Sequence, residues 1–210
     1  MLDAHYSQND QARQFDQALL AAHDSAAADL NSHAAGVVDL AATAPLMPVF
    51  LDASGAAAKN SSARDLSLAP EGPLGRIEIA SIGLKAMIQE GTGRQTLQRG
   101  VGHIVGTSLL GASGNIGLAG HRDTFFRQLR NIHEGAEITL TTLEGSFLYR
   151  VDQISIVEPE DSQVLRDSGE NLLTLVTCYP FSYVGPSPKR FIVRAHQVPT
   201  TAPTTVTAIQ

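Results

Sequence analysis

Short stretches in which apolar and polar residues alternate, separated by glycines, fill the chain from Leu74 onward. Ile77 and Ile79 alternate with charged residues, and Ile138 and Leu140 alternate with threonines. A period of two residues is typical of β-strands with one buried face. The other apolar runs that predict strands span residues 84–88, 116–119, 147–156, 172–177 and 191–198. Seven or eight short strands with few helical segments between them predict a mainly β protein, built as a closed or nearly closed barrel.

The first 70 residues have a different pattern. Over residues 8 to about 30, small and apolar residues recur at steps of three and four. This spacing, in a segment rich in Ala and Gln, predicts an amphipathic helix. Residues 52–62 are small and polar, and they predict a linker. The positions that define the apolar face of the predicted helix are Ala12, Phe15, Leu19 and Ala22.

These patterns divide the chain into an acidic, Ala-rich extension over residues 1–70, a β-barrel domain over 71–200 and a flexible tail over 201–210. The extension is interpreted as a stalk, a lid, a partner surface or a loosely packed or disordered segment, and the sequence does not choose among them. If it covers a site on the barrel, its deletion should raise activity. If it is only a stalk, its deletion should change neither the rate nor the stability of the barrel.

Charge and hydropathy exclude several classes of protein. The 210 residues carry a net charge of −6, and residues 1–70 hold most of the imbalance, with eight Asp against three Lys or Arg. This acidity disfavours a nucleic-acid binder, which usually has a basic face. No run of 18 apolar residues predicts a membrane span, and Met1 is not followed by the basic and then apolar pattern of a signal peptide. We therefore expect either a cytoplasmic protein or a chain from which an anchor was removed.

Cys178 is the single cysteine of the chain, and it ends the apolar run that begins at Leu172. One cysteine excludes an internal disulfide framework and a Cys-rich zinc site. No acidic cluster has the loop spacing of a calcium site, so we expect neither a metal nor a cofactor. An unpaired cysteine is either a reactive thiol or a small buried apolar residue.

A reactive cysteine needs a base or a cation nearby, because the thiolate is the nucleophile. His121 follows Gly120 at the end of the apolar run 116–119, where a rigid strand end can display a side chain. Arg190 begins the last apolar run and could donate fixed hydrogen bonds to a developing oxyanion. Each is a weak signal alone, but together they indicate cysteine chemistry at one end of the barrel.

Residues 120–126 (GHRDTFF) and 174–181 (TLVTCYPF), followed by Arg190, resemble the signature of sortases, the transpeptidases of bacterial cell surfaces, and are most similar to class D, including its Gram-negative members. The similarity covers roughly residues 72–200. It implies an eight-stranded barrel in which His121, Cys178 and Arg190 are the catalytic residues. It also implies that Thr177, Leu175 and Tyr179 contact the substrate, Thr177 by helping to place the acyl oxygen.

The resemblance further implies a reaction and its partners. The cysteine would cleave an LPXTG-like sorting signal after its threonine, and an amine of a cell-wall precursor or of a protein would resolve the thioacyl intermediate. The protein would then act at the extracytoplasmic side of a bacterial membrane, with a membrane anchor absent from this sequence. Two alternatives remain: a cysteine peptidase that transfers the acyl group to water, and a non-enzymatic β-barrel binding module with an inert Cys178.

Five further charged residues carry narrower predictions. Arg194 lies on the same strand face as Arg190, but the resemblance favours Arg190 as the functional arginine. Asp123 could complete a Cys-His-Asp triad, although we expect it to cap a helix over 124–129 instead. Arg122 belongs to a small basic cluster that we expect to be a solvated face. The other members of that cluster are Arg127 and Arg130.

Overall fold

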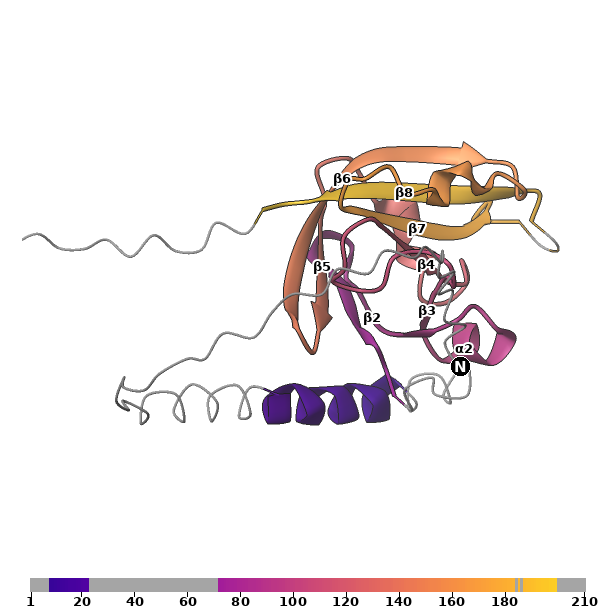
Figure 1. Ribbon diagram of the computed structural model, residues 1–210. Helices are drawn as coiled ribbons and strands as arrows, with labels where there is room; N and C mark the ends of the chain where they lie inside the picture. The colour runs from indigo at the N-terminus through magenta and orange to yellow at the C-terminus, as the bar shows by residue number, and fades with distance from the viewer. Residues whose placement is uncertain (1–7, 23–71, 184, 186, 200–210) are drawn as a thin grey trace, which may run out of the picture.

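Eight strands close into a single barrel in the computed structural model, which describes residues 8–22, 72–183, 185 and 187–199 (Figure 1). The predicted closed barrel is therefore confirmed. The strands in chain order are β1 (Gly75–Ile79), β2 (Leu84–Glu90), β3 (Val101–His103), β4 (Asn115–Ala119), β5 (Glu137–Thr142), β6 (Gly145–Val157), β7 (Leu172–Tyr179) and β8 (Lys189–Gln197).

The order of the strands around the barrel is β1-β2-β3-β4-β7-β8-β6-β5, and β5 pairs with β1 to close the ring. Two pairs are parallel, β2 with β3 and β4 with β7, and the others are antiparallel. The crossover from β4 to β7 places two strands that are far apart in the sequence side by side. It therefore brings the ends of β4 and β7 together at one end of the barrel.

Alternation along the strands fills the barrel interior. In β1, Ile77 and Ile79 are fully buried while Arg76 and Glu78 are partly exposed. Ile138 and Leu140 of β5 are also fully buried, and all four isoleucine and leucine residues belong to one core cluster. The period of two read from the sequence thus corresponds to the inner and outer faces of the barrel wall.

Two short elements escaped the sequence prediction. Strand β3 has three residues, including Gly102, so it is too short to show an alternating pattern. Helix α2 (Arg94–Arg99) is a six-residue segment with no buried residue and no side-chain cap. Three 3-10 helices complete the described elements: η2 (Ala80–Ile82), η3 (Arg127–Asn131) and η4 (Ser162–Leu165).

A helix over residues 8–22 packs against the barrel on the side of β1 and β2 (Figure 1, indigo). Its anchor is Phe15, which is only 2% exposed, and the guanidinium of Arg76 lies 5.9 Å from the centre of the Phe15 ring. The residues predicted to form the apolar face are the ones turned inward. They are Ala12, Phe15, Leu19 and Ala22, all buried or half-buried.

Polar contacts fix the start and the middle of this docked helix. The side chain of Gln8 accepts a hydrogen bond from the Met87 backbone N–H at 2.9 Å and donates one to the Arg99 carbonyl. Asp16 forms an ion pair with Arg76 at 2.9 Å. The rest of the predicted helix to Leu30, the linker over 52–62 and the domain boundaries at 70 and 200 lie outside the described residues.

Candidate functional site

Cys178 and Arg190 face each other across two neighbouring strands. The antiparallel register of β7 and β8 pairs the two residues directly. Both are partly exposed, and Cys178 is a free thiol. Residues opposite each other in an antiparallel pair have side chains on the same face of the sheet. The thiol and the guanidinium therefore share the outer face of the barrel near the end of β7.

His121 lies just past the end of β4, the strand that pairs with β7 on the side away from β8. In the parallel register of β4 and β7, Ala119, two residues before His121, pairs with Val176, two residues before Cys178. The two segments stay connected past the end of β4, because the Gly120 N–H donates to the Val176 carbonyl at 3.2 Å. The side chain of His121 is exposed. The structure thus brings the chain segment of His121 to the strand that carries Cys178.

Gly120 is required by close packing just before the histidine. A Cβ atom at this position would lie 2.8 Å from the ring of Phe126, which is fully buried in the core. Such contacts do not occur between real Cβ atoms and rigid rings, so the backbone passes the ring only without a side chain. The close approach expected from the glycine is therefore what the structure contains, and it fixes the path of the chain into His121.

Strand alternation separates the residues predicted to contact the substrate. Leu175 is fully buried in the core cluster, so its side chain points away from the face that carries Cys178. Thr177 also points inward, is 2% exposed, and donates its hydroxyl to the Gly120 carbonyl at 2.7 Å. The ring of Tyr179 stacks on Phe191, with 6.1 Å between centroids, at the barrel end beside Cys178.

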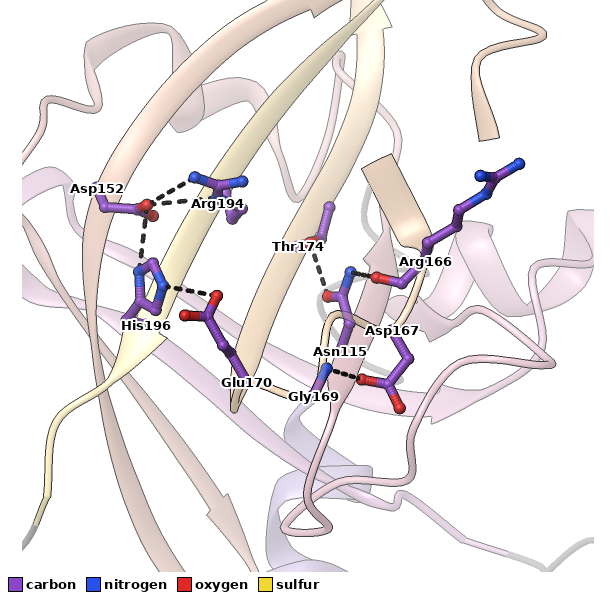
Figure 2. Close-up of polar contacts among 9 residues, drawn as sticks. All are labelled: Asn115, Asp152, Arg166, Asp167, Gly169, Glu170, Thr174, Arg194 and His196. Carbon is purple, nitrogen blue, oxygen red and sulfur yellow. Dashed lines mark hydrogen bonds and ion pairs between the residues drawn. The ribbon is translucent and has the colours of Figure 1, made fainter. Parts of the chain in front are cut away.

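Arg194 lies four residues along β8 from Arg190 and is engaged elsewhere. Its guanidinium pairs with Asp152 at 3.0 Å, and Asp152 also contacts His196 at 3.2 Å (Figure 2). In the strand register Arg194 lies opposite Thr174, whereas Arg190 lies opposite Cys178. Arg194 is thus part of an ion-pair chain on the outer face of β6 and β8.

The prediction of a solvated Arg122 is wrong. Arg122 is 8% exposed, and its guanidinium donates to the Pro180 carbonyl at 2.9 Å, to the Tyr183 carbonyl and to the Ser187 hydroxyl. These acceptors belong to the β7–β8 loop. The sequence could not reveal this role, because an arginine in a turn is normally solvated and the loop lies about 60 residues away.

The prediction that Asp123 caps a helix is also wrong. A turn follows His121, and the next helical segment, η3, begins at Arg127 with Phe126 as its N-cap and no side-chain capping bond. The Asp123 carboxylate instead lies 3.5 Å from the Nε of Arg122 and is largely exposed. Asp123 therefore turns toward the arginine beside it.

The β6–β7 loop is tied down by one buried amide. Asn115 is 2% exposed, and its side-chain nitrogen donates to the carbonyls of Val164 and Arg166, both at 3.1 Å. Its side-chain oxygen accepts from the Thr174 hydroxyl at 2.8 Å (Figure 2). Beside this amide, a cavity of about 210 Å³ lies between the loop and the outer face of β6, β7 and β8. The loop is thus held as a wall over the face that carries Cys178.

Other ionisable groups in the described residues are committed to structure. His103 is 1% exposed and contacts Glu90 at 3.0 Å and the Ser108 carbonyl at 2.9 Å. Burial raises the pKa of Tyr149 to about 12. In the described part of the chain, no three His, Cys, Asp or Glu side chains gather as metal ligands, and no helix there is long and apolar enough to cross a membrane.

Comparison with known proteins agrees with this geometry. Residues 77–198 match the Sortase domain family, which is more than half of the chain. The chain therefore belongs to the sortase family. The barrel and the site described above both fall within the matched residues.

Individual relatives support the class D resemblance. The chain is 39% identical to Sortase D of Bacillus subtilis over 126 residues, covering 59% of this chain and 63% of that protein. A Clostridium perfringens Sortase D5 transpeptidase structure aligns with a TM-score of 0.56 at 32% identity, covering 61% of this chain and 80% of that one. The structure of sortase C-1 from Actinomyces oris aligns with a TM-score of 0.57 at 36% identity, covering 62% of this chain and 76% of that one. The chain spans less than two thirds of the length of the Bacillus protein.

Proposed function

We propose that this protein is a cysteine transpeptidase that joins a sorting-signal peptide to an amine through a thioacyl intermediate. The observation that carries the proposal is the direct pairing of Cys178 with Arg190 in the strand register. We infer that His121, two residues past the end of β4, acts beside them, because β4 runs parallel to β7 and Ala119 pairs with Val176. Membership of the sortase family supports the same reaction.

In the first half-reaction the Cys178 thiolate attacks the carbonyl carbon of the threonine in the sorting signal. A carbon–sulfur bond forms, and the negative charge moves to the carbonyl oxygen. The Arg190 guanidinium is the donor aimed at that oxyanion, and it keeps its proton throughout. When the carbon–nitrogen bond breaks, the His121 imidazolium gives its proton to the leaving amine.

In the second half-reaction an incoming amine attacks the thioester carbon. His121 now accepts the proton from this amine, the carbon–sulfur bond breaks and the Cys178 thiolate is restored. Atoms and charges return to the starting state, with one peptide bond exchanged for another. If water replaces the amine, the same steps give hydrolysis, so the acceptor decides between a transpeptidase and a peptidase.

The substrate class follows from the family. We infer that the acyl donor is a protein with an LPXTG-like signal and that the acceptor is an amine of a cell-wall precursor or of another protein. We further infer that the protein works at the extracytoplasmic side of the bacterial membrane. Val176, half-buried and two residues before Cys178 on the same strand face, is the side chain we propose as a peptide contact in place of Leu175.

The test is a ligation assay with fluorogenic LPXTG-like peptides and a glycine-based amine, run with the wild-type chain and with Cys178→Ala. We expect a ligated product from the wild type and a loss of at least about a thousandfold in rate for the variant, because the nucleophile is gone. The thermal midpoint should stay the same, since Cys178 is partly exposed.

Each other outcome has a definite meaning. Hydrolysis that no added amine diverts would make the protein a peptidase. Full cleavage by Cys178→Ala would rule out the thioacyl route. A wild-type Cys178 that neither cleaves any peptide nor reacts with iodoacetamide in the native state would favour an inert barrel that only binds partners.

A further inference from the structure

The four hydrogen-bond acceptors of Arg122 lie in the β7–β8 loop, which connects the strand of Cys178 with the strand of Arg190. Arg122 itself follows His121 directly in the chain. One buried guanidinium therefore touches the segment after the cysteine at Pro180 and the segment before the functional arginine at Ser187. It links all three chain segments that form the site.

Ser187 is contacted by two arginines at once. Its hydroxyl accepts a hydrogen bond from the Nη1 of Arg122, and its backbone carbonyl accepts one from the Nη1 of Arg190 at 3.4 Å. The Arg190 guanidinium also donates to the Lys189 carbonyl at 3.2 Å. The position of the Arg190 head group therefore depends on where the loop carbonyls lie, and Arg122 is the group that holds this end of the loop.

We propose that Arg122 is a positioning residue that places the Arg190 guanidinium through Ser187. This inference rests on the proposed function only where it predicts a change in kcat. The planar guanidinium suits the role because it offers five N–H groups in a fixed fork, which can bind several loop oxygens at once. A lysine keeps the charge but offers a single ammonium, so it cannot hold Pro180, Tyr183 and Ser187 together.

The mechanism makes the consequence specific. Arg190 acts on the oxyanion, which exists only in and near the transition state. A misplaced Arg190 therefore lowers kcat more than it raises KM. We expect Arg122→Lys to lower kcat by about tenfold to a hundredfold, the cost typical of a displacement near 1 Å in a catalytic group, with KM changed by less than about threefold.

A double-mutant cycle tests the coupling. Arg122→Lys, Arg190→Lys and the double variant are compared in the ligation assay, with Arg127→Lys as the matched control, because Arg127 is an exposed arginine of the same segment. If Arg122 works through Arg190, its substitution should change kcat little once Arg190 is already lysine. Ser187→Ala should reproduce part of the loss.

A spectroscopic readout separates this proposal from the proposed function. The Nε–Hε signal of Arg190 in a ¹⁵N-labelled protein, assigned by its loss in Arg190→Lys, should shift in Arg122→Lys and stay in place in Arg127→Lys. If the signal shifts in Arg122→Lys but the wild-type protein does not ligate peptides, the proposed function fails and the positioning role stands. The role of Arg122 is overturned if the Arg190 signal stays in place in Arg122→Lys. It is also overturned if the wild type is active and the effects of Arg122→Lys and Arg190→Lys on kcat are fully additive.

Discussion

The helix over residues 8–22 and the loop between β7 and β8 are both attached to the barrel, but by different forces. The helix is held mainly by Phe15, which is 2% exposed, while the loop is held by hydrogen bonds from Arg122 to loop oxygens. Apolar burial is non-directional and roughly proportional to the area covered. Hydrogen bonds to a planar guanidinium fix direction as well as distance.

This difference separates stability from positioning. The helix contacts β1, β2 and the end of α2, on the side of the barrel opposite β6 and β8 (Figure 1). The described part of the extension is therefore a docked element that should contribute to stability, and it does not lie over the site. Whether the extension as a whole serves as a stalk, a lid or a partner surface stays a prediction.

The substitution with the largest expected effect is Phe15→Ala, which tests whether apolar burial holds the helix on the barrel. Truncation of a buried phenylalanine should lower the free energy of unfolding by about 3 kcal/mol, and Leu20→Ala, at a position 68% exposed on the same helix, should change it little. Chemical denaturation measures both. The native alkylation rate of Cys178 should stay at the wild-type value; a large change in that rate would mean that the helix and the site are coupled.

Asn115→Ala should have an intermediate effect, on the site side of the molecule. The substitution removes the hydrogen bonds of Asn115 to the Val164 and Arg166 carbonyls and to the Thr174 hydroxyl, and loss of such buried hydrogen bonds should cost about 2 kcal/mol. Because the β6–β7 loop begins where Val157 pairs with Arg190, we infer that it borders the site, and KM for the peptide should rise more than kcat falls. Asn131→Ala, at an exposed position, is the control, and equal effects of the two variants would contradict the clamp.

Asp16→Ala should have the smallest effect. Asp16 is more than half exposed and Arg76 is 18% exposed, so their ion pair is largely screened by solvent and should contribute about 0.5 kcal/mol. The difference from wild type, measured by denaturation, should shrink in 1 M salt because screening weakens exposed pairs. A loss as large as that of Phe15→Ala would mean that charge, and not apolar burial, docks the helix.

Much of the fold was predictable because local patterns report burial. The alternation at Ile77 and Ile79 indicated a strand with one buried face, and the spacing of Ala12 and Phe15 indicated a helix with one apolar face. Strand β3 was missed because three residues cannot display a period. The inward direction of Leu175 follows from its alternation with Cys178 along the strand, which a resemblance to a signature does not take into account.

The sequence by itself determined the strand content, the amphipathic helix, the single thiol and the family signature around His121, Cys178 and Arg190, because each is a property of neighbouring residues. The tertiary structure decided which distant segments meet. The parallel pairing of β4 with β7 brings the chain segment that leads into His121 to the strand of Cys178, and the burial of Arg122 against a loop some 60 residues away makes it a clamp. Such long-range contacts depend on chain closure and on the desolvation of a charged group, which no local pattern records.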